Sequence, residues 1–350
     1  MSCKLLGERM NRSVAQLICD LRNGAGALPQ RHRGPEPNTS TTRLAKMDDE
    51  NEYPGEVEIG MGLTREAGSL SKEQVGFYEE EGYIVLPNLL TEEDMAPARA
   101  AMTEKVSIIA EDLLQAGLIS DKLEHRPFEY RLAELFRELT AADFLEYGRG
   151  WRDRLPGYFH LMSNPKILDA VESLIGGELF SNPVYNTRPK IPKVAAGAVP
   201  WHQDKSYWPD ANSNPVITVW IPLVDTNERN GCLHIKPRTH RKRLLKWHRE
   251  TESGTGYTAL REDQLGKTPT VALPVSAGSA ILFNDRCLHM STLNRSDGVR
   301  WSVDLRYQPT DQDPMPQHGV GFLARSCKHP ERVATLEDWL AKRMEHEAGS

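Results

Sequence analysis

The sequence predicts a mainly β protein in which a layer of helices precedes a β-sandwich or barrel. Helix signals, such as the capping box Ser71-Lys-Glu-Gln74, gather before residue 178, and one more helix is expected at the end of the chain. From about residue 179 the pattern changes to short β-branched and apolar runs separated by Pro, Gly, Asn and Asp. Strands at such spacing are typical of a sandwich or barrel and not of alternating β-α units.

Each predicted helix has a recognisable start or end. The first begins at the capping box and runs to Glu80, and Gly82 ends it because glycine readily adopts the left-handed conformation found after a helix. Further helices are predicted at 91–115, 127–139, 165–174, which Gly176-Gly177 ends, and 336–345, which Thr335 caps. The predicted strands are 83–86, which Pro87 ends, and 179–187, 216–224, 232–235, 270–274, 280–283, 288–292 and 299–307.

The first 46 residues differ in composition from the rest of the chain. They contain eight Lys or Arg against three acids, and residues 23–42 are rich in Gly, Pro, Asn, Ser and Thr. Such a segment buries little apolar surface, so we expect residues 1–69 to be a disordered tail and an acidic linker. The tail could instead be an Arg-rich organelle presequence, or extra sequence before a start at Met47. A single domain is expected at 70–350, with its barrel at about 179–310.

Composition excludes several classes of protein. The 350 residues carry 43 basic and 49 acidic side chains, and the formal net charge of −6 gives no general attraction for nucleic acid. Mean hydropathy is −0.53, and no run approaches the roughly 18 apolar residues that a membrane span needs. The five cysteines form no C-x-x-C pair, so neither a disulfide framework nor a structural zinc site is indicated. A reducing, cytoplasmic location is therefore the default expectation.

Residues 199–210 contain a pattern typical of a metal site. One residue separates His202 from Asp204, so on an extended chain both side chains point to one face while Gln203 points away. Two histidines and one carboxylate are the ligand set of non-heme Fe(II) oxygenases, in which coordination positions stay open. His289 is the best candidate for the third ligand, because it follows an apolar run where a histidine needs a reason to face inward. Taken alone, His289 could equally be a hydrogen-bonded core residue.

A candidate anion receptor follows on the next predicted strand. Arg300 and Ser302 share a face by the same period-two rule. A guanidinium with a hydroxyl beside it suits the distal carboxylate of a dicarboxylate cosubstrate. The alternative is a structural ion pair between Arg300 and Asp304 or Glu228.

Longer segments resemble the phytanoyl-CoA dioxygenase family of Fe(II)- and 2-oxoglutarate-dependent oxygenases. The resemblance is carried by LSKEQVGFYEEEGYIVLPNLLTEEDM (70–95), WHQD (201–204), VWIPLVDTNERNGCLHIKPRTH (219–240) and GSAILFNDRCLHMSTLNRSDGVRWSVDLRYQP (278–309). These motifs occur in the family's order and spacing, and they span residues 70 to about 310. The resemblance implies a double-stranded β-helix core, jelly-roll or cupin-like, behind the helical layer.

The same resemblance implies roles for individual residues. His202, Asp204 and His289 would be the catalytic metal ligands that hold Fe(II), and Arg300 would bind the far carboxylate of 2-oxoglutarate. Other family positions near the cosubstrate match Ser302, Gln203, Trp220 and Asn294, and Asn186 or Arg188 is a looser candidate for one more contact. In the triplet Arg238-Thr239-His240 the family's usual glycine is missing, which leaves the conformation of that loop open.

The reaction that the resemblance implies is oxidation, most simply hydroxylation, of a C–H bond of a small organic substrate. It would consume O₂ and 2-oxoglutarate at Fe(II), release succinate and CO₂, and use ascorbate as an optional addition. Asp204 favours this outcome because halogenating relatives lack the carboxylate ligand. Two alternatives stay open: a cupin-like metalloenzyme that does not use 2-oxoglutarate, and a catalytically silent binding barrel. The expected partner is a small molecule, with no nucleic acid and no membrane, and the sequence does not indicate the oligomeric state.

Two further segments lie near these motifs. The stretch 238–249 is the most basic of the chain, and we predict a solvated loop there, or else a surface that attracts an anionic substrate. Segment 244–268 has no regular pattern and is a candidate lid over the substrate. Trp201, Tyr207 and Trp208 flank the metal motif and could form either a pocket wall or part of the barrel core.

Overall fold

The computed structural model describes residues 68–148, 155–194, 197–210, 215–251 and 255–348. All of these residues belong to one compact unit of the chain, Val57–Ser350. The expected tail and nearly all of the expected linker, residues 1–67, lie outside the described residues. The disordered tail and its alternative, a presequence, therefore stay predictions.

Helices precede the sheets, and one helix closes the chain. In order they are α2 (Lys72–Glu81), α3 (Glu92–Gln115), α4 (Phe128–Leu135), α5 (Ala141–Tyr147), α6 (Pro156–Met162), α7 (Pro165–Ile175) and α8 (Leu336–Ala348). Capping boxes start α2 at Ser71 and α3 at Thr91, where each side chain accepts a hydrogen bond from a backbone N–H of the first turn. The sequence did not predict α5 and α6, because seven residues are too few to show a helical period.

Two antiparallel sheets form the β part. The larger has seven strands in the order β1 (Tyr83–Leu86), β10 (Ala280–Asn284), β5 (Ile217–Pro222), β12 (Arg300–Pro309), β2 (Glu178–Ser181) and β13 (Phe322–Ser326), with β3 (Asn186–Lys190) also paired to β12. The smaller has the order β4 (Val199–His202), β11 (Leu288–Ser291), β6 (Leu233–Lys236) and β9 (Val271–Leu273), and β7 (His248–Arg249) pairs with β8 (Thr258–Ala259). The predicted mainly β core behind a helical layer is confirmed.

The strand predicted at 179–187 is in fact two strands, β2 and β3. Asn182 interrupts it, because its side-chain oxygen accepts a hydrogen bond of 2.8 Å from the backbone N–H of Val184 and forms a local turn. Pro183 stands inside the same turn. The predicted helix at 127–139 is also shorter, since α4 ends at Leu135.

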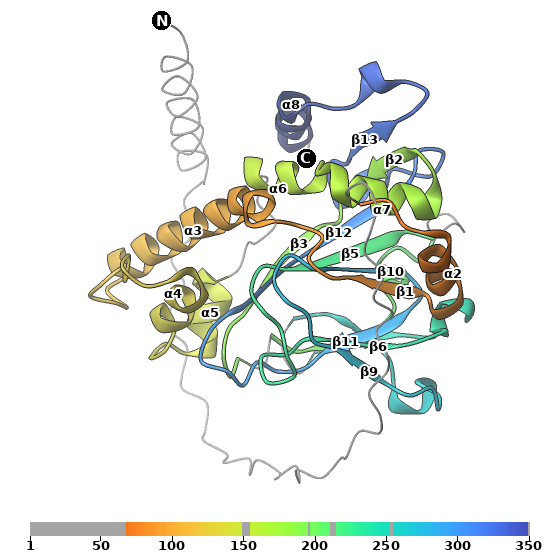
Figure 1. Cartoon of the computed structure of the whole chain (residues 1–350). Coiled ribbons are helices and arrows are strands. Elements are labelled where there is room, and N and C mark those ends of the chain that lie inside the picture. Colours follow the sequence, from red (N-terminus) through yellow and green to blue (C-terminus); the bar gives the residue numbers. More distant parts are fainter. Residues whose placement is uncertain (1–67, 149–154, 195–196, 211–214, 252–254, 349–350) are drawn as a thin grey trace, which may run out of the picture. The chain divides into compact units, whose positions relative to one another are not determined.

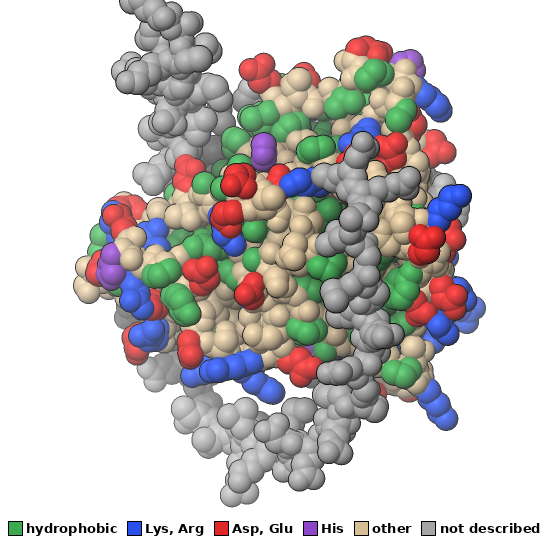
Figure 2. Space-filling model, viewed as in Figure 1, with side chains coloured by type: hydrophobic (Ala, Val, Ile, Leu, Met, Phe, Trp, Pro, Cys, Tyr) green, Lys and Arg blue, Asp and Glu red, His purple; other side chains and the backbone are tan. Residues whose placement is uncertain are grey.

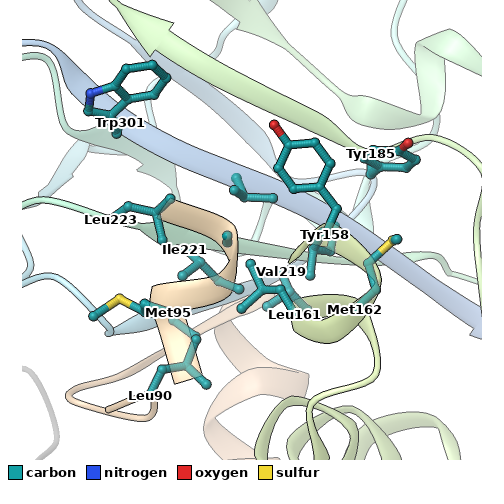
Figure 3. Close-up of a cluster of buried hydrophobic side chains, with 14 of the residues drawn as sticks. Leu90, Met95, Tyr158, Leu161, Met162, Tyr185, Val219, Ile221, Leu223 and Trp301 are labelled. Carbon is teal, nitrogen blue, oxygen red and sulfur yellow. The ribbon is translucent and has the colours of Figure 1, made fainter. Parts of the chain in front are cut away.

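The main hydrophobic core lies between the larger sheet and the helices. Figure 1 shows α3, α6 and α7 on one side of this sheet and the smaller sheet on the other. In Figure 3, Val219, Ile221 and Trp301 from the sheet lie together with Tyr158 and Leu161 from α6. A second, smaller core fills the space between the sheets; its members are Tyr83, Val85, Trp220, Leu233, Ile235, Leu273, Ile281, Phe283 and Cys287.

Strand β12 separates these two environments by its alternation. Its odd-numbered side chains join the core beneath the helices; they are Trp301, Val303, Leu305 and Tyr307. Its even-numbered side chains face the other way and are polar; they are Arg300, Ser302, Asp304, Arg306 and Gln308. One strand thus anchors the helical layer on one face and supplies charged groups to the barrel interior on the other.

None of the described helices is both long and apolar enough to cross a membrane. On the face shown in Figure 2, acidic and basic side chains are interspersed.

Candidate metal centre and cosubstrate site

Three potential ligands converge at the edge of the smaller sheet. His202 ends β4 and lies opposite His289 on the neighbouring strand β11. Asp204 follows after Gln203, whose extended backbone (φ −113°, ψ 130°) turns both of its neighbours to one face before the chain enters a short 3₁₀ turn. The Nε2 atoms of His202 and His289 lie 3.4 and 3.7 Å from Oδ1 of Asp204, and the candidate ligand atoms all lie within 4.8 Å of one another.

The two imidazoles are oriented by the backbone. Nδ1 of His202 lies 2.9 Å from the carbonyl oxygen of Pro200, and Nδ1 of His289 lies 3.0 Å from that of Cys287. With Nδ1 protonated and donating to the carbonyl, each Nε2 keeps its lone pair for a metal. Burial and the neighbouring His202 lower the pKa of His289 to about 3, so its imidazole is neutral at physiological pH.

The surroundings of the Asp204 carboxylate indicate what kind of ion suits this site. Its Oδ2 accepts from Thr218 Oγ1 at 2.7 Å and from Arg306 Nη2 at 2.9 Å. Its Oδ1 is buried, has no hydrogen-bond partner among the described residues and faces the two Nε2 atoms. Burial opposes ionisation, but Arg306 and the imidazoles hold the pKa of Asp204 well below its usual range. An ionised, unpartnered oxygen between two imidazoles suits a divalent metal ion.

Arg300 lies close to this cluster, on β12. It is 1% exposed, and its guanidinium stacks 5.5 Å above the Trp220 ring and donates to Ser302 Oγ at 2.5 Å. Its Nε has no partner among the described residues. Burial and then Arg188 lower the pKa of Arg300 to about 10, which leaves the guanidinium cationic.

Arg300 does not form an ion pair with Asp304, which was the alternative expectation for this arginine. Asp304 pairs instead with Arg188 at 2.7 Å and with Arg306 at 2.6 Å. Arg306 in turn joins Asp304 to the metal-ligand candidate Asp204. The sequence reasoning singled out neither Arg306 nor Thr218. Asp304 and Arg306 lie four and six residues after Arg300, so the same period-two rule places their side chains on the same face as Arg300.

Lys190 is a second buried basic residue, and the sequence did not indicate it. It pairs in register with Arg300 across β3 and β12 and is 2% exposed. Its Nζ donates to Ser291 Oγ at 2.7 Å and also to the Thr292 carbonyl oxygen. A Cβ at Gly231 (φ +82°) would lie 3.1 and 3.2 Å from its Cδ and Nζ, so a glycine leaves room for the lysine. Burial, then Arg300, lowers the pKa of Lys190 to about 5.

Two of the predicted cosubstrate residues, Gln203 and Asn294, hydrogen-bond to backbone groups. The side-chain Nε2 of Gln203 donates to the Arg286 carbonyl oxygen at 2.8 Å, and its Oε1 accepts from the Leu245 N–H at 2.8 Å. Asn294 donates to the carbonyl oxygens of Lys190 and Gly298, both at 2.7 Å. Neither side chain lines a cavity at the candidate site.

Two more of the predicted contacts, Trp220 and Asn186, line cavities at the site. Trp220 lines a small cavity of about 30 Å³ together with the candidate metal ligands and Arg300. Asn186 lines a much larger cavity of about 610 Å³ and donates to Asp304 at 2.7 Å. The two cavities share four lining residues, so they adjoin; these are Arg188, Val199, Arg300 and Arg306.

The loop that lacks the family's usual glycine keeps a glycine-like conformation. Arg238 has φ 63° and ψ 4°, in the left-handed region. Its side chain pairs with Glu81 at 2.5 Å. A non-glycine residue in this region carries some backbone strain.

Comparisons with known proteins agree with the geometry. The family model of phytanoyl-CoA dioxygenase matches residues 78–302. The chain is 27% identical over 253 residues to the peroxisomal phytanoyl-CoA dioxygenase of Mus musculus, covering 69% of each chain. It is 24% identical over 295 residues to ectoine dioxygenase of Bordetella parapertussis, covering 79% of this chain and 86% of that one.

Solved structures share the fold. The alpha-ketoglutarate-dependent carbocyclase SnoK of nogalamycin biosynthesis superposes with a TM-score of 0.50 at 24% identity, covering 74% of this chain and 92% of that one. The non-heme monooxygenase ThoJ superposes with a TM-score of 0.50 at 17% identity, covering 79% and 98%. At these sequence identities the structural similarity shows the fold alone, and it supports the double-stranded β-helix core.

Proposed function

The chain belongs to the phytanoyl-CoA dioxygenase family, and from this premise we propose how its residues serve an Fe(II)- and 2-oxoglutarate-dependent dioxygenase that oxidises a small organic molecule. We assign the metal to His202, Asp204 and His289. The observation that carries the assignment is the buried, unpartnered Oδ1 of Asp204 facing two Nε2 atoms.

When bound, Fe(II) and 2-oxoglutarate activate O₂ and supply the oxidising power, with succinate and CO₂ as products. The protein would contribute the three side chains that hold the metal, two from paired strands and one from the turn after β4. Arg306 and Thr218 hold Oδ2 of Asp204, so Oδ1 keeps its direction toward the imidazoles.

We propose that Arg300, Ser302 and Lys190 form the receptor for the distal carboxylate of 2-oxoglutarate. Arg300 and Lys190 lie side by side on paired strands, and no carboxylate among the described residues forms an ion pair with either. A carboxylate placed between them would pair with the Arg300 guanidinium and would favour the protonated form of the Lys190 amine, whose pKa is about 5 without it. Trp220 lies under the guanidinium and limits the tilt that Arg300 can adopt.

Hydroxylation of a C–H bond is the outcome we propose for the unidentified substrate. The carboxylate ligand Asp204 occupies a position that a halide would need in a halogenating site. The relatives named above act on phytanoyl-CoA and on ectoine by their names, and both are small organic molecules. The 610 Å³ cavity beside the metal site offers room for such a substrate.

The direct test is product formation from a metabolite pool. With Fe(II), 2-oxoglutarate, ascorbate and O₂, the wild-type protein should release succinate in proportion to the substrate oxidised. Asp204→Ala should release none above background. Substrate oxidation without succinate would contradict the proposal and favour the cupin-like alternative that does not use 2-oxoglutarate.

A cytoplasmic location also remains a proposal. It rests on the cysteine pattern alone, while the mouse relative is peroxisomal by name. A fusion of residues 1–46 to a fluorescent protein tests it, because an organelle signal there would move the reporter out of the cytoplasm.

A further inference from the structure

The large cavity next to the metal site is lined by positive charge. Five basic side chains line it, and among the described residues no Asp or Glu does; the basic residues are Arg188, Lys190, Arg249, Arg300 and Arg306. A cavity with this lining favours an anionic occupant.

Only part of this charge is neutralised by the protein itself. Arg306 pairs with Asp204 and Asp304, and Arg188 pairs with Asp304. The dianion 2-oxoglutarate brings as much negative charge as Fe(II) brings positive charge, so loading the site leaves the balance unchanged. Arg300 and Lys190 are assigned to the distal carboxylate, and Arg249 then has no anionic partner among the described residues.

Arg249 is held in place at the solvent end of the cavity. It is exposed, and its guanidinium lies 5.4 Å from the Trp247 ring and 5.9 Å from the Tyr207 ring. Its Nη1 donates to the Gly256 carbonyl at 3.0 Å. Two aromatic contacts and one backbone bond limit the orientations of the group, which lowers the entropy cost of binding a ligand.

The distance from Arg249 to the metal site suits a small molecule. Tyr207 packs edge-on against the ligand candidate His202, with ring centroids 5.9 Å apart. Arg249 is therefore one aromatic ring beyond the metal ligands. Another part of the lining is apolar and includes Phe144, Ile191 and Val194.

We propose that the substrate carries an oxyanion, a carboxylate or a phosphate, which Arg249 binds at the cavity mouth while the apolar part of the substrate lies against Phe144, Ile191 and Val194. This inference rests on the proposed function, because it assumes that 2-oxoglutarate occupies the inner cations. It places the oxidised carbon about one aromatic ring's breadth inward from the anionic group.

The test uses protein loaded anaerobically with Fe(II) and 2-oxoglutarate, and isothermal titration with three probes that share a phenyl group. The probes are 4-phenylbutanoate, phenyl phosphate and the neutral 4-phenylbutanamide. At least one anion should bind about tenfold or more tightly than the amide, since a charge-assisted hydrogen bond is worth about 1.5–3 kcal/mol. The anion that binds more tightly shows whether the site prefers a carboxylate or a phosphate.

Variants decide whether Arg249 is responsible. Arg249→Gln should abolish the preference for the anion, whereas Lys246→Gln should keep it. Lys246 is an exposed cation of the same segment that does not line the cavity, so its loss controls for net charge. An unchanged preference in Arg249→Gln, equal binding of anion and amide, or no binding of any probe to the wild type would overturn the inference.

Loading is measured first, so that the two proposals can fail separately. If both variants and the wild type take up 2-oxoglutarate normally and the anion preference is absent, only the substrate inference fails. If the wild type does not take up 2-oxoglutarate, the proposed function itself fails.

Discussion

The two oxygens of the Asp204 carboxylate lie in different surroundings. Oδ2 is fixed by Thr218 and Arg306, whereas Oδ1 faces the imidazoles without a partner. Removing a group that orients a metal-ligating carboxylate typically costs 10–100-fold in metal affinity. The hydroxyl of Thr218 should therefore influence metal binding although it is not itself a candidate ligand.

Thr218→Val should weaken Fe(II) binding about tenfold without unfolding the protein. Equilibrium metal titration measures this change. Thr226→Val is the matched control, because Thr226 is also buried but hydrogen-bonds to Val275 away from the site. Equal metal affinity in the Thr218 variant and the wild type would show that the hydroxyl does not orient Asp204.

Lys190 permits a test with two ligands that differ by one carboxylate. Lys190→Met should weaken binding of 2-oxoglutarate about tenfold or more, because it leaves the distal carboxylate with Arg300 and Ser302 alone. Binding of 2-oxopentanoate, which lacks that carboxylate, should not change. Lys193→Met, an exposed neighbour, controls for charge. Equal weakening of both ligands would mean that Lys190 only supports Ser291 and Thr292.

Burial of Lys190 also predicts a pH dependence of stability. Its pKa is about 5 in the folded protein against an ordinary value of 10.5. Between these values the unfolded chain binds one more proton than the folded one, so stability rises with pH through this window and falls as pH drops toward 5. As pH rises, the free energy of unfolding of the ligand-free wild type should increase by up to about 1.4 kcal/mol per pH unit relative to that of Lys190→Met. Urea unfolding at pH 6, 7 and 8 measures it; parallel pH profiles of the two proteins would refute the account.

Within single elements, β12 shows what the sequence could and could not reveal. Its alternation predicted the strand and the shared face of Arg300 and Ser302. The same alternation contains Asp304 and Arg306, but their ion pairs run to Arg188 on β3 and to Asp204 after β4. Which charged side chains form ion pairs depends on how strands distant in sequence pair with one another. The residue pattern of a single strand does not contain that information.

The apolar face of β12 carries the contact with the helical layer. Trp301 is fully buried, stacks on Phe128 at 4.9 Å and donates its indole N–H to the Phe128 carbonyl at 3.2 Å. Trp301→Ala should lower the free energy of unfolding by about 3–5 kcal/mol. Urea denaturation measures this loss, with Trp301→Phe expected to lose less. Phe77→Ala, at an exposed aromatic of α2, should cost little, and a similar loss in both alanine variants would contradict this packing.

Seen across the whole molecule, the site belongs to no single segment. His202 and His289 come from paired strands of the smaller sheet, whereas Arg300, Lys190 and Thr218 come from three strands of the larger sheet. The sequence predicted the ligand set because HxD and the later histidine are local signals. The sequence did not indicate that Gln203 and Asn294 hydrogen-bond to backbone carbonyls and line no cavity. These hydrogen bonds depend on how segments distant in sequence pack against the two side chains.

The most direct test of the central claim is an anaerobic titration of the protein with Fe(II) and 2-oxoglutarate, followed by visible absorption. A cosubstrate that chelates iron at this site gives a metal-to-ligand charge-transfer band. The wild type should develop the band only when both are present, Arg300→Gln should need far more 2-oxoglutarate, and Asp204→Ala should show none. A band of unchanged intensity in Asp204→Ala, or no band in the wild type with iron bound, would contradict the account.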